Sequence, residues 1–297
     1  MDKSIPRIAV LFASFNGENF IEEQYASIIG QINVEVTIFF SDDCSSDSTL
    51  KKIEKFCLAN RNCRLISFDN KFGSACENFL NLIINSPIDD FDYISFADQD
   101  DIWLPNKLYR AITIMNSNDA SGYSSDILSW NPQKHEYKRI IKYGAQTKFD
   151  YMFQGPGPGC TFVLKINEAL NLRDFLKSMP ANDRKEIWFH DWFIYAYFRN
   201  NNKKWFIDSY IGMLYRQHSF NVIGSNIGIK GITDRIQILK KWRNQTIILS
   251  EIIGYANKLP LIKIKKLDMY IIKSPLKSRR KILHSLMLFI ASIFRLF

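Results

Sequence analysis

Three carboxylates stand close together in the run Asp98-Gln99-Asp100-Asp101. Residues 93–97 before them suit a buried strand, and alternation along an extended chain would point Asp98 and Asp100 the same way. Two like charges at ~4 Å repel by roughly 1 to 4 kcal/mol near a protein surface, and a divalent cation turns that repulsion into binding. Carboxylate oxygens suit Mg²⁺ or Mn²⁺, so the run indicates a metal site. The alternative is a solvated acidic turn that caps the next helix.

The elements before the acidic run alternate between strand and helix signals. Short apolar segments predict strands at residues 8–13, 34–40, 64–68 and 93–97, and helical spacing of apolar residues predicts helices between them. Such a series predicts an α/β fold, with a largely parallel sheet, helices on both faces and ligands at the carboxyl ends of the strands. Asp42 ends the second strand as Asp98 ends the fourth, so both are expected at one edge of the sheet.

The middle of the chain is less regular. Strands are predicted at 122–130 and 205–215, and an aromatic helix over 187–198 is expected to open with His190 and Asp191. Residues 154–161 are rich in Gly and Pro. Glycine there lets the backbone approach a ligand closely, and an ordinary loop is the equal alternative.

Charge is unevenly distributed along the 297 residues. The chain carries a net +9, yet residues 230–297 hold 15 Lys/Arg against 3 Asp/Glu. This asymmetry predicts a catalytic body at 1–228 and a basic helical region at 229–297. A hydrophobic content of 46% excludes a disordered chain. Five cysteines without a Cys-x-x-Cys pair, and first residues without an apolar signal core, predict reduced thiols and a cytoplasmic location.

The basic region itself has a helical pattern. Apolar residues recur at helical spacing from Gly231 onward, Lys and Arg accumulate over 263–281, and residues 282–297 are mostly apolar. A segment this short, interrupted by His284 and Arg295, does not make a confident membrane-spanning helix. A basic segment followed by an amphipathic one favours an interfacial helix on anionic lipid. Docking onto the catalytic body or onto a partner is the alternative.

Six short motifs follow one another along the chain. They are Ser14-Phe15-Asn16-Gly17, Asp42-Asp43-Cys44-Ser45-Ser46-Asp47, Asn70-Lys71-Phe72-Gly73, Asp98-Gln99-Asp100-Asp101-Ile102-Trp103, His190-Asp191-Trp192 and Tyr215-Arg216-Gln217-His218. Their order and spacing resemble glycosyltransferase family 2, over roughly residues 6–225. Within that family the chain looks most like the bacterial rhamnosyltransferase-like members that build surface polysaccharide. The resemblance implies a GT-A fold and inverting transfer from a nucleotide-diphosphate sugar.

The resemblance assigns the nucleotide to the first half of the chain. It implies that the loop containing Ser14 and Asn16 borders the nucleotide, and that Asp42 accepts a hydrogen bond from the pyrimidine ring. Gly73 and Asn78 are expected beside the ribose and the phosphates. For Asp42, capping of the following helix is the alternative.

The resemblance also assigns the reacting groups. Asp98 and Asp100 match an Asp-x-Asp motif for Mn²⁺ or Mg²⁺, with Asp100 expected as the direct ligand. Asp191 matches the catalytic base, and Arg216 and His218 stand where a loop reaches the diphosphate. Two residues have structural alternatives: Asp191 as the N-cap of its helix, and Arg216 as part of a surface ion pair.

Two positions depart from the family pattern. His190 stands where glutamate is commoner, as it does in the rhamnosyltransferase-like subset, and we expect it to be structural rather than catalytic. His218 is followed by Ser219 and Phe220, where a glycine and a polar residue are more usual. The loop role of His218 is therefore less firmly implied than that of Arg216.

The residue types suit glycosyl transfer on chemical grounds as well. Breaking the anomeric C–O bond passes through an oxocarbenium-like state, as in glycoside hydrolysis. A cation at Asp98 and Asp100 stabilises the charge that gathers on the leaving diphosphate, and Arg216 adds a clamp on phosphate. Asp191 is the candidate to take the proton of the acceptor hydroxyl. Inversion needs one displacement only, so no second carboxylate acts as nucleophile.

These inferences lead to one function and two alternatives. The expected donor is dTDP-rhamnose, supplying L-rhamnose, or otherwise a UDP-hexose. The expected acceptor is a saccharide or lipid-linked oligosaccharide in surface polysaccharide synthesis, reached at the cytoplasmic face of the membrane through the C-terminal region. A sugar-phosphate nucleotidyltransferase would need a glycine-rich basic loop that residues 14–17 do not supply. A non-enzymatic, basic membrane-binding protein is the second alternative, whereas no nucleic-acid motif is present.

Overall fold

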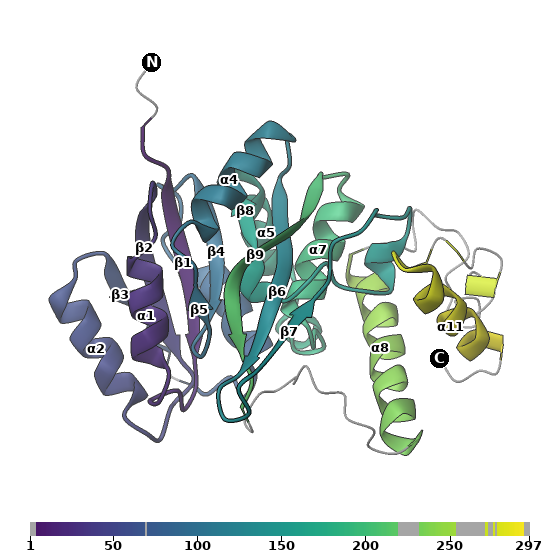
Figure 1. The fold of residues 1–297 in the computed structure, drawn as a ribbon, viewed down its shortest axis with the longest axis horizontal. Coiled ribbons are helices and arrows are strands. Elements are labelled where there is room, and N and C mark those ends of the chain that lie inside the picture. The colour runs from purple at the N-terminus through teal and green to yellow at the C-terminus, as the bar shows by residue number, and fades with distance from the viewer. Residues whose placement is uncertain are drawn as a thin grey trace.

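The computed structural model describes residues 4–68, 70–218, 232–253, 271–272, 276 and 278–293. Its first half alternates strands and helices as the sequence predicts (Figure 1). These elements are β1 (Arg7–Ser14), α1 (Ile21–Ile29), β2 (Glu35–Asp42), α2 (Thr49–Ala59), β3 (Cys63–Leu65), α3 (Ala75–Asn85), β4 (Tyr93–Asp98), β5 (Ile102–Trp103) and α4 (Lys107–Ser117).

The second half of the described chain completes the sheet and adds further helices. Its elements are β6 (Gly122–Asn131), β7 (Glu136–Ile140), the short 3-10 helices η1 (Asp150–Met152) and η2 (Gly159–Thr161), β8 (Val163–Lys165), α5 (Ile166–Ser178), α6 (Ala181–Lys185), α7 (His190–Asn200), β9 (Trp205–Arg216), α8 (Ile232–Ile252) and α11 (Ile282–Ile293). The predicted domain boundary at 228/229 lies outside the described residues.

One mixed sheet runs through the molecule in the order β3-β2-β1-β4-β8-β6-β9-β5, with β7 paired to β6. Strands β3, β2, β1 and β4 are parallel, which confirms the predicted parallel arrangement for the first half. Beyond β4 the sheet is mixed, because β8 pairs antiparallel with both β4 and β6, whereas β6 and β9 are parallel. The prediction of a mostly parallel sheet therefore holds for the half of the sheet that the βα series forms, namely β3, β2, β1 and β4.

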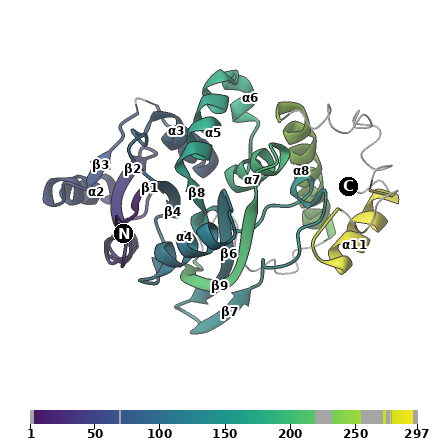
Figure 2. The same cartoon turned by 90° about the horizontal axis from the view of Figure 1, so that it is seen from above.

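Two apolar layers cover the two faces of this sheet. Along β1, Ile8, Val10 and Phe12 enter the layer that contains residues of α1, α2 and α4. The alternating residues, such as Leu11, enter the layer formed with α3, α5, α7 and α8. Figure 2 shows α4 on one side of the sheet and α5 and α7 on the other. Burial on both faces explains why β1 is apolar throughout rather than alternating with polar residues.

Two details differ from the sequence-based expectations. The third strand ends at Leu65 rather than continuing to residue 68. Residues Ile102 and Trp103 form the short strand β5, which pairs antiparallel with Leu214 and Met213 of β9. A two-residue strand carries no periodicity of its own, so only its distant partner defines it.

The C-terminal helices pack against the catalytic body. Helix α8 confirms the predicted helical pattern, and its Leu249 is fully buried in the core layer that includes α7. Trp188, just before α7, donates its backbone N–H to Gln245 Oε1 at 3.0 Å. Helix α11 lies beside α8, at the end of the molecule opposite α2 (Figure 1). Within the described residues, no helix has both the length and the apolar character needed to cross a membrane.

Candidate active site

The register of three parallel strands gathers polar side chains at the carboxyl edge of the sheet. Ser14 at the end of β1 lies opposite Asp42 of β2, and Ala13 lies opposite Asp98 of β4. The Ser14 hydroxyl donates to Asp42 Oδ1 at 3.1 Å. The predicted meeting of the two acidic strand ends is thus observed in the sheet register.

The loops after β1 and β2 are tied to each other by hydrogen bonds. Asp42 accepts from the Ser45 backbone N–H at 2.8 Å and from the Ser45 hydroxyl at 2.5 Å. Asn16 donates its backbone N–H to Ser45 Oγ and accepts from the Ser46 N–H, each at 2.8 Å. Asp42 therefore holds the turn after its own strand, and it does not cap the helix that begins at Thr49.

Gln99, which the sequence did not single out, fixes the loop after β1. Its amide accepts from the Phe15 N–H and donates to the Phe15 carbonyl, both at 2.8 Å. A Cβ on Gly17 would lie 2.2 Å from Gln99 Oε1, so only glycine leaves room for this contact. Gln99, which stands between two aspartates in the sequence, thus holds the loop after β1 in place through its amide. We call these two hydrogen bonds the Gln99 clamp.

Asp43 is a second residue that the sequence analysis left without a role. The side chain is 4% exposed and accepts from the backbone N–H groups of Phe72 and Gly73, the latter at 2.9 Å. Gly73 has φ of +78°, a conformation that favours glycine. Asn78 lies 2% exposed beneath this loop and donates to the Ser41 carbonyl at 3.4 Å. The predicted ribose and phosphate residues therefore stand on the loop and helix that Asp43 positions.

The acidic run forms a half-buried cluster with a cysteine. Strand β4 ends at Asp98 and the next two residues form a turn, so strand alternation does not direct Asp100. Ligand atoms of Asp98, Asp101 and Cys160 lie within 4.8 Å of one another. Burial, and then the charge of Asp100, raise the pKa of Asp98 to about 7 and that of Asp101 well above its ordinary value. A divalent cation would favour the ionised carboxylates instead.

Asp100 faces the residues that follow β9. His218 Nε2 lies 2.7 Å from Asp100 Oδ2, and the His218 ring stacks on Phe20 with ring centroids 4.6 Å apart. Arg216 donates to the Asp100 carbonyl at 2.9 Å. The structure therefore brings the predicted metal ligand and the two predicted diphosphate residues to one place. The carboxylate oxygens are the donors here that suit Mn²⁺ or Mg²⁺.

Arg216 is held from several sides. Its guanidinium pairs with Glu23 of α1 and lies over the rings of Trp130, at 4.6 Å, and Phe20, at 5.2 Å. Only 7% of its side chain is exposed. The expected alternative, a surface ion pair, is therefore present in this structure: the Glu23 side chain is 59% exposed, although that of Arg216 is buried.

Asp191 lies in the first turn of α7, where its Oδ1 accepts from the Trp192 backbone N–H at 2.7 Å. Burial raises its pKa to about 6, and the positive charge of Lys142 opposes this shift. Asp191 is not the N-cap of α7, because Phe189 occupies that position, so the capping alternative is wrong. The pKa of the carboxyl lies close to the working range of a general base. Lys142, between β7 and η1, is a neighbour that sequence reasoning missed.

His190 precedes Asp191 and is enclosed by aromatic rings. Its ring centroid lies 4.4 Å from that of Phe79, and burial lowers its pKa to about 3. Its Nε2 has no hydrogen-bond partner among the described residues. A Cβ on Gly159 would lie 2.2 Å from that nitrogen. The neutral, packed imidazole agrees with the structural role expected of it.

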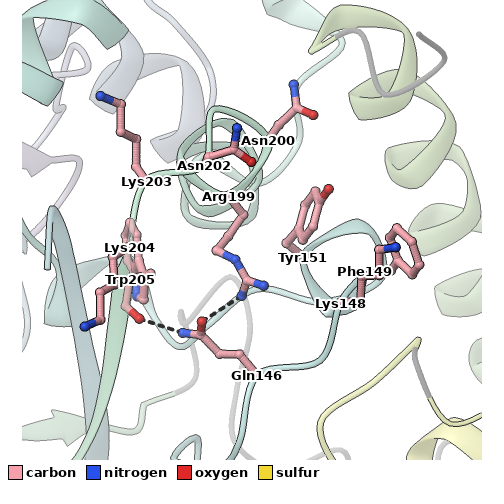
Figure 3. A pocket seen from close by; sticks show the side chains of 10 residues that line it. All are labelled: Gln146, Lys148, Phe149, Tyr151, Arg199, Asn200, Asn202, Lys203, Lys204 and Trp205. Atoms are coloured by element: carbon pink, nitrogen blue, oxygen red, sulfur yellow. Dashed lines mark hydrogen bonds between the residues drawn. The ribbon is translucent and has the colours of Figure 1, made fainter. Parts of the chain in front are cut away.

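A separate pocket of about 580 Å³ lies at the other end of α7 (Figure 3). Arg199 crosses it and bonds to Gln146 Oε1 at 2.8 Å. Its lining comprises Gln146, Lys148, Phe149, Tyr151, Arg199, Asn200, Asn202, Lys203, Lys204 and Trp205. None of the site residues expected from the sequence lines this pocket, so it is distinct from the edge that carries the acidic groups.

Sequence comparisons agree with this arrangement. Residues 9–223 match the family model described as Glycosyl transferase family 2. The dTDP-rhamnosyl transferase RfbG of Shigella flexneri is 40% identical over 232 residues, which cover 77% of this chain and 80% of that protein. WfgD of Escherichia coli, a UDP-Glc:alpha-D-GlcNAc-diphosphoundecaprenol beta-1,3-glucosyltransferase, is 27% identical over 145 residues, covering 46% of this chain and 55% of that protein.

Solved structures share the fold at low sequence identity. Staphylococcus aureus TarS in complex with UDP matches with a TM-score of 0.54 at 13% identity, covering 98% of this chain and 90% of that one. The mannosyltransferase PcManGT of Pyrobaculum calidifontis, in complex with GDP-Man and Mn²⁺, gives the same TM-score and identity over 98% and 75% of the two chains. The GT-A fold is thereby confirmed, and the transferase hypothesis prevails over the nucleotidyltransferase and the non-enzymatic binder. The chain belongs to glycosyl transferase family 2 and is a rhamnosyltransferase-like glycosyltransferase.

Proposed function

We propose that this protein is a metal-dependent, inverting glycosyltransferase that moves L-rhamnose from dTDP-rhamnose to a saccharide acceptor. The observation that carries the donor assignment is the 40% identity to a dTDP-rhamnosyl transferase over most of both chains. A UDP-hexose is the second donor to test. The residues at the carboxyl edge of the sheet supply the groups that such a transfer needs.

The donor site is proposed at the loops after β1, β2 and β4. Ser14, Asn16 and Asp42 would border the nucleotide, with Gly73 and Asn78 beside the ribose and the phosphates. The hydrogen bonds between these loops support the proposal, because a site that is already ordered costs less conformational entropy on binding.

The diphosphate site is proposed at the end of β9. Asp98 and Asp100 would hold Mn²⁺ or Mg²⁺, which when bound neutralises charge on the departing diphosphate, and His218 would lie beside the diphosphate. Arg216 can add a bidentate contact to phosphate, provided that it exchanges Glu23 for the ligand.

The acceptor is proposed to approach Asp191. Its ionised carboxylate would take the proton from the acceptor hydroxyl as that oxygen attacks the anomeric carbon. The hydroxyl oxygen forms the new bond while the bond to the diphosphate breaks, so a single displacement inverts the anomeric centre. A pKa near 6 leaves the base ionised at neutral pH while keeping it more basic than an ordinary aspartate.

The acceptor is proposed to be carried on a lipid at the cytoplasmic face of the membrane, in surface polysaccharide synthesis. The exposed apolar side chains of α11 support peripheral membrane contact, and they include Ile282, Leu283 and Met287 at 67%, 66% and 61% exposure. The E. coli relative, whose acceptor is a diphosphoundecaprenol-linked sugar, offers a precedent.

Thermal unfolding tests the donor proposal. The protein is heated with dTDP, UDP, GDP or CMP, each with and without Mn²⁺, beside an Asp100→Asn variant. Nucleotide at ~100 times its Kd stabilises the fold by about 2.7 kcal/mol. For a chain of this size that raises Tm by roughly 5 to 10 °C. A Mn²⁺-dependent shift with dTDP that Asp100→Asn loses is the expected result. No shift with any of the nucleotides would contradict the proposed function.

A further inference from the structure

One cation lies beside the carboxyl that is proposed as the catalytic base, and three more lie near that cation. The ammonium of Lys142 is close enough to Asp191 for their charges to act on each other. Arg279, Arg280 and Lys281 also act on Lys142, and they come from the start of the segment that leads into α11. Residues separated by more than a hundred positions thus meet beside the proposed acceptor position.

Arg280 locks this segment to the catalytic body. It donates to Asp150 Oδ2 at 2.9 Å and to the Gly155 carbonyl at 2.7 Å. A Cβ on Gly155 would lie 3.7 Å from the Trp192 Cα, next to Asp191, and one on Gly157 would lie 3.6 Å from the Lys142 Cγ. The Gly/Pro-rich loop therefore runs between the base and the cations. If the loop approaches a ligand as expected from the sequence, the contact would lie between Asp191 and Lys142.

Three of the four cations have no acidic partner at ion-pair distance within the described part of the chain. Arg280 is neutralised by Asp150, whereas Lys142, Arg279 and Lys281 form no such ion pair. Arg279 is only 9% exposed, stacks on Trp242 with its Cζ 4.9 Å from the ring centroid, and leaves its Nε without a hydrogen-bond acceptor among the described residues. Arg279 is buried, whereas Lys142 is half-buried with Asp191 as a neighbouring negative charge, and Lys281 is exposed. Burying a cation such as Arg279 without a counter-charge is costly, so an anionic ligand would stabilise this arrangement.

The ligand also has an apolar neighbour. Helix α11 follows the cations directly, and large apolar side chains on it remain exposed in the folded protein. They are Ile282, Leu283, Leu286, Met287, Ile290 and Ile293. The opposite face packs inward through Ser285, Leu288 and Ser292, which are at most 4% exposed. Positive charge followed by an exposed apolar helix face complements a lipid that carries a phosphate group.

We propose that Lys142, Arg279 and Lys281 form an acceptor subsite that binds the phosphate of a lipid-linked saccharide, whose lipid lies along the exposed face of α11. The inference rests on the proposed function, because it places the saccharide of that acceptor at Asp191. It goes further by naming the residues that recognise the acceptor and the chemical group that they bind. Arg280 is a positioning residue in this arrangement, since Asp150 already neutralises its charge.

The competing explanation is that Lys142 acts only on Asp191. A cation beside the base lowers the pKa of that base, so Lys142→Gln would then shift the pH profile of transfer and leave lipid binding unchanged. Phosphate recognition predicts a loss of lipid binding instead. The two explanations therefore differ in a binding measurement that needs no turnover.

Vesicle co-sedimentation provides that measurement on the full chain. Three vesicle types are compared: phosphatidylcholine alone, phosphatidylcholine with a polyprenyl diphosphate, and phosphatidylcholine with phosphatidylglycerol at the same total charge. The proteins are wild type, Lys142→Gln, Leu283→Ser and Lys51→Gln. Lys51 is an exposed lysine of α2, at the opposite end of the molecule (Figure 1), so its variant controls for the change in net charge. The nucleotide-induced Tm shift reports on folding and on the donor site in every variant.

Wild type is expected to bind the diphosphate vesicles at least about tenfold more tightly than the phosphatidylglycerol vesicles, as charge-assisted contacts to one group would provide. Lys142→Gln should remove that preference, Lys51→Gln should keep it, and Leu283→Ser should weaken binding to all vesicles. Equal binding by Lys142→Gln and Lys51→Gln, or no preference in wild type, would overturn the subsite. Either result can occur while the nucleotide shift persists, so failure of the subsite is distinguishable from failure of the proposed function.

Discussion

The proposed donor side and the proposed acceptor side of this enzyme are built differently. On the donor side, the loops after β1, β2 and β4 are joined by short hydrogen bonds, such as the clamp of Gln99 on Phe15. On the proposed acceptor side, Lys142 lies beside the proposed base and near Lys281, and neither lysine has an acidic partner at ion-pair distance among the described residues. The loops of the first region bond to one another, although Asn78 Oδ1 and both carboxylate oxygens of Asp101 have no hydrogen-bond partner among the described residues. The second region instead carries an excess of positive charge.

From this difference we expect the two substrates to be bound in different ways. An ordered donor site binds with little rearrangement, so its residues act chiefly through geometry. A charged acceptor site attracts its ligand electrostatically, and its residues act through protonation and ionic contacts. Substitutions on the two sides should therefore differ in their effects on turnover, stability, pH dependence and nucleotide binding, and four experiments can test this.

Asp191→Asn should show the largest effect. Removing a general base lowers turnover by roughly 100- to 10,000-fold. Nucleotide binding should remain, because Asp191 stands on the acceptor side, whereas Asp100→Asn should abolish the Mn²⁺-dependent nucleotide shift. Burial disfavours the ionised carboxyl, so the Tm of Asp191→Asn should equal or exceed that of wild type. Transfer at the wild-type rate would show that Asp191 is not the base.

Asp150→Asn should show how firmly the acceptor side is anchored. Asp150 is fully buried and accepts from Arg199 at 3.2 Å, from Arg280 at 2.9 Å and from the Tyr195 hydroxyl at 2.8 Å. Leaving two buried cations without their counter-charge costs about 3 kcal/mol or more, so thermal unfolding should record a Tm lower by roughly 6 to 12 °C.

The matched control for this substitution is Asp89→Asn. Asp89 pairs with Arg173 at 2.7 Å, but its side chain is 61% exposed. An exposed pair contributes at most about 1 kcal/mol, so the control should change Tm far less. Similar losses for both variants would mean that the buried cluster does not anchor the C-terminal segment.

The pH dependence of transfer should report the base directly. Because burial raises the pKa of Asp191 to about 6 and the ionised form is the active one, kcat/KM should fall as pH decreases through 6. At pH 5 the loss is about tenfold. Lys142→Gln removes a charge that favours the carboxylate, so the acid limb should move to higher pH. An acid limb near 4 in wild type would contradict the raised pKa.

The smallest effect is expected for the clamp on the donor side. Gln99→Ala removes two hydrogen bonds to Phe15, costing about 1 kcal/mol each at most, and should weaken nucleotide binding a few-fold. Gly17→Ala displaces Gln99, because its Cβ would lie 2.2 Å from Oε1. The two changes remove the same contact, so isothermal titration should find the double variant less impaired than the sum of the single ones. Additive losses of binding free energy would mean that Gly17 does not act through the hydrogen bonds of Gln99.

Much of the donor side could be predicted from the sequence. Apolar segments followed by polar residues predicted the parallel strands and the acidic strand ends, because both features depend on residues that are close together in the sequence. The same local patterns did not reveal Gln99 and Asp43, whose partners Phe15 and Phe72 lie 84 and 29 positions away. Their roles follow from how neighbouring loops pack, which no periodicity records.

The sequence by itself determined the βα series, the acidic strand ends, the helices of the C-terminal region and the order of the family motifs. Those features depend on local apolar spacing and on residue types. Only the tertiary structure decided the pairing of β5 with β9, the grouping of Asp101 with Cys160, and the approach of Lys142 to Asp191 and of Arg280 to Lys142. Arg280 meets Asp150 across 130 positions, and such a contact exists only because the packed core brings both segments to one surface.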